Sequence, residues 1–216
     1  MGIKFITLNQ TFAENIKKLG YDAEIINIQD YVIHKKTYYV SPANSLCFMD
    51  GGIDRALSTI VFPNIEPNIK NIIKSLNIKN IVGKYYLPIG SSIIIDYNQH
   101  KSLIVAPTML LPQNVSNTKN AYYATMAILF NILENKKENI NNIDILFTSL
   151  CCGYGKMNED ESIKQIIQGI NDYKSYSPLI VNNNIIIKEP NLQQQPKIYQ
   201  NTEWFNINPS DIKNIL

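Results

Sequence analysis

Apolar and polar residues alternate along the chain in blocks that predict strands and helices in turn. Short apolar runs rich in β-branched side chains and bounded by Gly, Pro, Asn or Asp are typical of buried strands. Such runs predict strands at residues 3–9, 23–29, 37–43, 80–87, 91–96, 102–107 and 142–150, with a hairpin turn between the fifth and the sixth. Tyr38 and Tyr39 fall within one of these runs and indicate packing in a strand rather than a stacking surface.

Between the predicted strands, apolar residues recur three and four positions apart, which indicates amphipathic helices. The stripes are Phe12, Ile16 and Leu19; Ile69, Ile72, Ile73 and Leu76; Tyr122, Met126, Leu129, Phe130 and Leu133 within 119–136; and Ile163, Ile166, Ile167 and Ile170. Thr11 stands three residues before Glu14, the spacing of a capping box, and Gly20 closes that helix. A further helix begins at Asp54 and ends before Pro63.

The alternation of strands and helices predicts an α/β fold with three α/β/α layers, in which a mixed, largely parallel central sheet is covered on both faces. Residues 1–175 are expected to form this domain. From Tyr176 the periodicity fades, and we expect residues 176–216 to be a C-terminal extension packed on the same domain. Residues 182–190 predict an edge strand in this extension, and Trp204 with Phe205 would anchor it.

Charge and composition restrict the classes of function. The 216-residue chain has a formal net charge of +2 and no block of Lys or Arg, which makes nucleic-acid binding by a basic face unlikely. No run approaches the roughly 20 apolar residues of a membrane span, and the N-terminal residues lack the pattern of a signal peptide. An odd count of three cysteines is a poor disulfide framework. We therefore expect a cytoplasmic protein that does not contact a membrane.

Two glycine-containing loops, 41–54 and 150–158, each lead from a predicted strand into a predicted helix. Ligands of α/β sheets bind at such loops, and glycine lets the backbone approach an anion closely. Neither loop is a P-loop, and Asn158 replaces the third glycine of a dinucleotide-binding pattern. The pair of loops predicts a cradle for a diphosphate.

Other chemistries find little support in the sequence. Cys47, Cys151 and Cys152 would need a fourth ligand at suitable spacing to hold zinc, and His34 and His100 do not offer one, so no metal is expected. The two histidines also lie far in sequence from the glycine loops, which excludes a Ser-His-Asp triad. We expect no cofactor.

Residues 29–57, with Asp30, the "SPANS" segment, Gly51, Gly52 and "IDRA", resemble the macro-domain family. Asp30 and Asn44 are 14 positions apart, as are the corresponding Asp and Asn of that family. The segment "LCCGYGKM" is similar to the family's later glycine loop, and "SLIVAP" to one of its strands. The resemblance covers residues 1–175 and is greatest to a phage- and giant-virus-like branch.

This resemblance implies the macro-domain fold, ADP-ribose binding, and hydrolysis of ADP-ribosyl groups from protein or from a related ADP-ribose derivative. It implies that Asp30 accepts a hydrogen bond from adenine, that Asn44 contacts the distal ribose, and that Tyr154 stacks near that ribose. Asn44 and Asp54 would be the catalytic residues. The remaining implied ligand contacts come from the two loops: Ala43, Gly51, Gly52, Ile53, Cys151, Cys152, Gly153 and Gly155.

The sequence departs from the family pattern at Ser41, Pro42, Met49–Asp50, Cys151–Cys152 and Ser58, the last of which stands where many hydrolytic members keep a His. Two alternatives to a hydrolase therefore stay open: a reader module that only binds ADP-ribose, and a viral structural or assembly protein that has lost the ligand. Taken alone, Asp30 reads as the polar end of a strand. Asp54 reads as a first-turn helix acid, worth about 0.3–1 kcal/mol.

Overall fold

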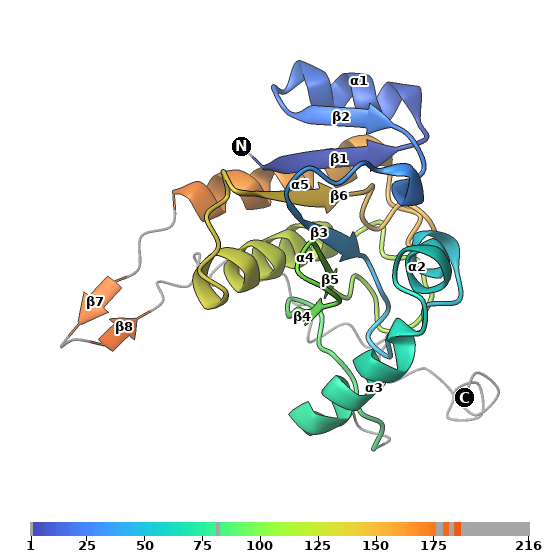
Figure 1. The fold of residues 1–216 in the computed structure, drawn as a ribbon, viewed down its shortest axis with the longest axis vertical. Helices are drawn as coiled ribbons and strands as arrows, with labels where there is room; N and C mark the ends of the chain where they lie inside the picture. Colours follow the sequence, from blue (N-terminus) through green and yellow to red (C-terminus); the bar gives the residue numbers. More distant parts are fainter. Residues whose placement is uncertain (1, 81–82, 176–178, 182–183, 187–216) are drawn as a thin grey trace. The chain divides into compact units, whose positions relative to one another are not determined.

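A six-stranded sheet is the centre of the first of two units of the chain (Figure 1). The computed structural model describes residues 2–80, 83–175, 179–181 and 184–186, and the two units, residues 1–175 and 176–216, are described separately. Neighbouring strands are parallel except for the last pair, which is antiparallel. The strand order is β2 (Asp22–Ile25), β1 (Ile3–Thr7), β6 (Ile143–Phe147), β3 (Lys36–Ser41), β5 (Lys101–Val105) and β4 (Ile93–Asp96).

Helices cover both faces of this sheet. Phe5, Tyr38 and neighbouring apolar side chains on one face pack against α1 (Gln10–Lys18), α4 (Asn120–Leu129) and α5 (Glu159–Lys174). The alternate strand residues, such as Ile6 and Tyr39, face the other way, because successive side chains of a strand point to opposite faces. They join a second core with the 3-10 turn η1 (Ile28–Asp30), α2 (Gly52–Ala56), the π-helical turn η2 (Leu57–Val61) and α3 (Ile65–Leu76). The predicted three-layer α/β/α fold is therefore confirmed.

The ends of α1 are set by local chemistry. Asn9, rather than Thr11, caps its N-terminus: the Asn9 side-chain oxygen accepts a hydrogen bond from the backbone N–H of Phe12 at 3.1 Å. The predicted capping box was wrong, since the Glu14 carboxylate instead accepts from Gln10. At the other end, Gly20 has a φ of +82°, as predicted for a residue that ends a helix.

The predicted strand at 80–87 is absent from the part of it that the structure describes. There the Gly83 N–H donates to the Asn80 carbonyl, and Lys79 and Tyr85 form one isolated bridge. Gly83 has a φ of +76°, which interrupts an extended run. The predicted long helix at 119–136 is α4 followed by a π-helical turn, η3 (Phe130–Asn135).

In the second unit, β7 (Leu179–Val181) pairs with β8 (Asn184–Ile186) as an antiparallel two-stranded sheet. The strand predicted within 182–190 thus includes β8, which pairs within this unit. The expected anchor, Trp204 with Phe205, lies outside the described residues.

Candidate functional site

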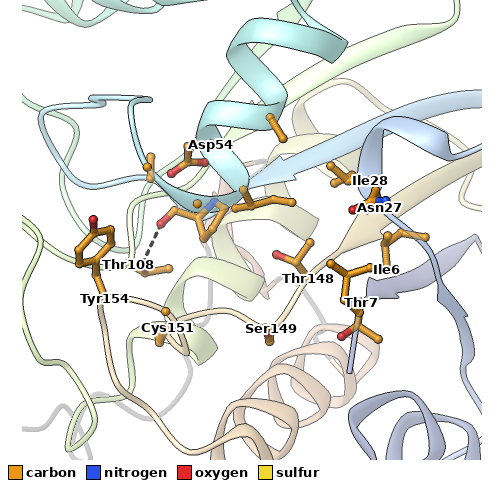
Figure 2. A pocket seen from close by; sticks show the side chains of 18 of the residues that line it. Ile6, Thr7, Asn27, Ile28, Asp54, Thr108, Thr148, Ser149, Cys151 and Tyr154 are labelled. Atoms are coloured by element: carbon orange, nitrogen blue, oxygen red, sulfur yellow. Dashed lines mark hydrogen bonds between the residues drawn. The ribbon is translucent and has the colours of Figure 1, made fainter. Parts of the chain in front are cut away.

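A cleft of about 890 Å³ lies at the C-terminal ends of the parallel strands. The loops that follow β1, β2, β3 and β6 all contribute to its lining, so segments far apart in sequence meet there. Figure 2 shows Asp54 and Tyr154 at one end and Thr7, Asn27 and Ile28 at the other, with Thr148 and Ser149 between them. The shape is that of an elongated site in the position where α/β sheets bind their ligands.

Most residues singled out from the sequence line this cleft. They are Ala43, Asn44, Gly51, Gly52, Ile53, Asp54, Cys151, Gly153 and Tyr154. Asp30, Cys152 and Gly155 do not line it. The structure thus places the two glycine loops on the same cavity and separates Asp30 from it.

Asn44 holds the loop after β3 in shape. Its side-chain oxygen accepts hydrogen bonds from the backbone N–H groups of Leu46 at 3.0 Å and Phe48 at 3.4 Å, and its amide nitrogen donates to the Phe48 carbonyl at 3.2 Å. The side chain is only 7% exposed. Asn44 therefore fixes the backbone that borders the cleft, and its amide keeps one N–H beyond these bonds.

Asp54 lies in the first turn of α2, half-buried at the wall of the cleft. The Ser41 hydroxyl donates a 2.7 Å hydrogen bond to its Oδ1 atom. The pKa of Asp54 is raised to about 7: burial raises it most, the Ser41 hydrogen bond lowers it, and the nearby Asp50 carboxylate adds a smaller rise. Near neutral pH this carboxyl group therefore exists in both protonation states, which is the property of a general base.

The two glycine loops touch at the Asp54 end of the cleft. A Cβ atom at Gly51 would lie 3.1 Å from Cε2 of Tyr154, so the tyrosine ring rests directly on the glycine backbone. The Tyr154 side chain is nevertheless 67% exposed. An exposed aromatic ring beside a close backbone contact provides one wall on which a sugar or base can pack.

The loop after β6 is held by backbone hydrogen bonds, one within the loop and one to Val115. The Met157 N–H donates to the Cys151 carbonyl at 3.0 Å, and the Gly155 carbonyl accepts from the Val115 N–H at 2.9 Å. Among the described residues, no protein acceptor pairs with the N–H groups of Gly153, Tyr154 and Gly155. Gly153 and Tyr154 line the cleft, so this loop offers backbone donors to an anionic ligand.

Burial disfavours the thiolate form of all three cysteines. Burial raises the pKa of Cys151 and of Cys47 to about 12, and it also raises that of the half-buried Cys152. A thiol rather than a thiolate is therefore present near neutral pH at each position. Cys152 donates weakly to the Leu150 carbonyl, with a sulfur–oxygen distance of 3.4 Å, which is a loop-stabilising role.

The opposite end of the cleft contains residues that the sequence did not single out. β2 ends at Ile25, and Asn27 then lines the cleft, while Asp30 lies three residues further on in η1 and is exposed. Thr7 and Leu8 reach the same end from β1. Their signal in the sequence was positional: each lies in the C-terminal half of a predicted strand, 3–9 or 23–29.

The charged side chains that line the cleft are all acidic. Within the part of the chain that the structure describes, they are Asp50, Asp54 and Glu159, and no Lys, Arg or His of that part belongs to the lining. Among the described residues, no group of three or more His, Cys, Asp or Glu side chains is arranged to hold a metal ion. Nor does any helix within them have the length and apolar character to cross a membrane.

Comparison with known proteins identifies the architecture. No family model and no curated protein matches the sequence. The chain is, however, similar to solved structures of the Oceanobacillus iheyensis macrodomain. A variant with ADPR superposes with a TM-score of 0.53 at 15% identity, covering 84% of this chain and 80% of the other. The chain has the macrodomain fold.

Two more structures of the same protein agree. The Oceanobacillus iheyensis macrodomain with ADP gives a TM-score of 0.52 at 18% identity, over 68% of this chain and 72% of that one. Another variant of that macrodomain gives a TM-score of 0.54 at 16% identity, over 78% of this chain and 75% of the other. At these identities the comparison establishes the macrodomain fold, and the chemistry of the cleft depends on the residues of this chain.

Proposed function

We propose that this macrodomain-like chain binds ADP-ribose, free or attached to a protein, and hydrolyses ADP-ribosyl bonds. The observation that carries the proposal is one elongated cleft on which both glycine loops meet, with Asp54 at the end where they touch. Its volume of about 890 Å³ falls in the range of small-molecule sites. The similar Oceanobacillus iheyensis structures with ADPR and with ADP support the same ligand class.

The cleft suggests how an extended nucleotide sugar would be arranged. The Asp54–Tyr154 end would take the distal ribose, with Asn44 and the Gly51–Gly52 backbone around it. The unpaired N–H groups of the loop after β6 would donate to the diphosphate. The opposite end, at Asn27 and Ile28, would take the base. Because no Lys, Arg or His among residues 2–80 and 83–175 lines the cleft, backbone donors would have to meet the phosphate charge.

Hydrolysis requires little beyond positioning. The oxygen of a water molecule forms a bond to the anomeric carbon of the distal ribose while the bond from that carbon to the modified group breaks. The water gives its proton to Asp54, whose pKa of about 7 suits a base near neutral pH, and the leaving group takes a proton from solvent. Rigid placement of the ribose supplies much of the remaining acceleration.

A reader that binds without turnover is the second candidate. Ser58 favours it, because its hydroxyl has two backbone carbonyls within reach of its one proton, that of Met49 at 3.0 Å and that of Arg55 at 3.3 Å, and it does not line the cleft. It therefore supplies neither a proton carrier nor a contact to ligand. Asp54 is then the one candidate base among the residues that the resemblance assigns to catalysis.

Calorimetry with ADP-ribose, ADP and AMP tests binding, and incubation with a mono-ADP-ribosylated protein tests turnover. We expect ADP-ribose to bind most tightly and Asp54→Ala to lower turnover with binding largely retained. Asn44→Ala should weaken binding at least tenfold, whereas Asp22→Ala, at the opposite end of β2, should change neither quantity. Equal affinity for ADP-ribose and AMP would contradict the proposal. Tight binding without turnover on several ADP-ribosyl linkages would instead support the reader module, which binds but does not hydrolyse.

Because Asn44 also holds its own loop, thermal melting has to accompany the binding measurement. Asn44→Asp keeps an oxygen that accepts from Leu46 and Phe48, but it removes the donor to the Phe48 carbonyl and adds a charge. We expect this variant to melt below the parent, to remain folded at the temperature of the calorimetry, and to lose affinity for ADP-ribose.

A further inference from the structure

The rim of the cleft at its Asp54 end combines an exposed aromatic ring with an exposed carboxylate. Tyr154 is 67% exposed, and its Cε2 atom lies 3.1 Å from the position that a Cβ atom of Gly51 would take. Asp50 directly precedes Gly51, is exposed and lines the cleft. Figure 2 shows Tyr154 and Asp54 on the same side of the cleft. The ring and the two carboxyl groups thus border the end at which a bound ADP-ribosyl group would carry its modified side chain.

No cation of the described residues neutralises these carboxyl groups. Within that part of the chain, no Lys, Arg or His forms an ion pair with Asp50 or Asp54. The Asp50 carboxylate raises the pKa of Asp54, so the two groups are close enough to interact. Lys70 lies over the ring of Phe48, which lines the cleft, but the Lys70 ammonium group pairs with Glu66 at 2.6 Å. The rim is therefore complementary to a ligand that brings its own positive charge.

An arginine side chain matches both the ring and the carboxylate. Its planar guanidinium stacks on aromatic rings, donates hydrogen bonds to carboxylates and stays charged near neutral pH. An ADP-ribosyl group joined to a guanidino nitrogen keeps this positive charge beside Asp50. An ADP-ribosyl ester of glutamate is neutral instead, and its hydrolysis releases a carboxylate that Asp50 would repel.

We propose that the modified group accepted at this rim is an arginine side chain, whose guanidinium stacks on Tyr154 and pairs with Asp50. The proposal rests on the proposed function and names the linkage on which it acts. In the reaction, the oxygen of water bonds to the anomeric carbon while the bond from that carbon to the guanidino nitrogen breaks, and its electron pair stays on the nitrogen. Asp54 takes the proton of the water, and the released guanidine takes a proton from solvent. A guanidinium therefore stands beside Asp50 both before and after the reaction.

The test compares three ligands: free ADP-ribose and two peptides of one sequence that carry the ADP-ribosyl group on either an arginine or a glutamate at the same position. Calorimetry is run on Asp54→Ala, in which slow turnover leaves the peptides intact. We expect the arginine-linked peptide to bind about fivefold or more tightly than the glutamate-linked one, the factor for one pair of opposite charges in contact with water. Equal affinity for the two peptides would overturn the proposal.

Two further substitutions on the Asp54→Ala background locate the preference. Asp50→Asn and Tyr154→Leu should each bring the ratio of the two affinities to within about twofold, because one removes the charge and the other the ring. The control is Glu159→Gln, which removes a charge from the same cleft at a residue that accepts a hydrogen bond from Asn9 at 2.7 Å. It should leave the ratio unchanged. A ratio retained in Asp50→Asn, or lost equally in Glu159→Gln, would show a general effect of charge and would overturn the proposal.

Turnover gives a second measurement, made with Asp54 present. Asp50→Asn should lower kcat/KM about fivefold for the arginine-linked peptide, whereas for the glutamate-linked peptide it should hold or rise. A fall for both peptides would contradict the pairing of Asp50 with arginine. Because each linkage is compared with itself, the intrinsic difference in lability between the two bonds does not enter.

The three ligands also separate this proposal from the proposed function. Tight binding of free ADP-ribose with no preference between the peptides supports the proposed function and overturns the arginine assignment. A preference for the arginine-linked peptide without turnover supports the assignment and a reader. A folded protein that binds none of the three ligands overturns both.

Discussion

Replacing Asp54 by Asn should stabilise the protein at alkaline pH and leave it unchanged at acid pH. Burial raises the pKa of Asp54 to about 7 from its ordinary 3.8, so the folded state binds a proton that the unfolded state has released between these values. Stability contributed by this group is therefore lost as pH rises from about 4 to about 7, and the loss then stays constant. The asparagine oxygen can still accept the Ser41 hydrogen bond, so the substitution removes the charge and keeps the contact.

The difference between the two pKa values corresponds to about 4 kcal/mol, and partial exposure to the cleft reduces this to about 2 kcal/mol. Urea unfolding at pH 5 and pH 8.5, followed by circular dichroism, measures the change. We expect Asp54→Asn to raise the unfolding free energy by about 2 kcal/mol at the higher pH and by much less at the lower one. An equal effect at both pH values would refute the reasoning, because it would show that ionisation of the Asp54 carboxyl group does not destabilise the folded protein.

Three further outcomes follow from single features of the cleft. Gly155→Ala should lower the free energy of urea unfolding by about 2–3 kcal/mol, because a Cβ there would lie 2.3 Å from the Cys151 carbonyl oxygen. The control Gly153→Ala, whose Cβ would have no atom within 4 Å, should change it by less than about 0.5 kcal/mol. Thr148→Val should stabilise by about 1 kcal/mol, since the buried Thr148 hydroxyl has no partner among the described residues, and a loss of stability would contradict this. The affinity for ADP-ribose should hold or improve between about 20 and 200 mM salt, because the charged lining is all acidic; weakening would indicate a cation at the phosphates.

The fold was largely predictable from the sequence because its central strands β3, β5 and β6 are buried on both faces. Such strands are continuous apolar runs, and the helices between them carry clear apolar stripes. The run at 80–87 was wrongly predicted to be a strand because it is rich in apolar residues. The positive φ of Gly83 interrupts the extended conformation there. Periodicity also could not reveal the π-helical turns η2 and η3, which continue helices α2 and α4 with one extra residue per turn.

The glycine-loop end of the cleft was also predictable, whereas the opposite end was not. Gly51, Gly52 and Asp54 stand in an unusual combination, and a close backbone approach explains why glycine is needed beside Tyr154. Thr7, Leu8 and Asn27 carry no such mark. The expected offset from Asp30 to Asn44 matched in sequence, yet η1 adds a turn after β2 and moves Asp30 away from the cleft.

The ionisation of Asp54 also separates the hydrolase from the reader. The Ser41 hydroxyl occupies Oδ1 of Asp54, which leaves Oδ2 to take a proton from water. A hydrolase that uses this base should show a turnover rate that rises with pH and levels off above about 7. The ionised carboxylate also repels the diphosphate, so affinity for ADP-ribose should fall over the same range in either case. One pH series of binding and turnover, repeated on Asp54→Asn, therefore decides the matter. Affinity that falls with pH in the parent but not in the variant identifies Asp54 as the titrating group, and turnover that rises in the parent alone makes it the base.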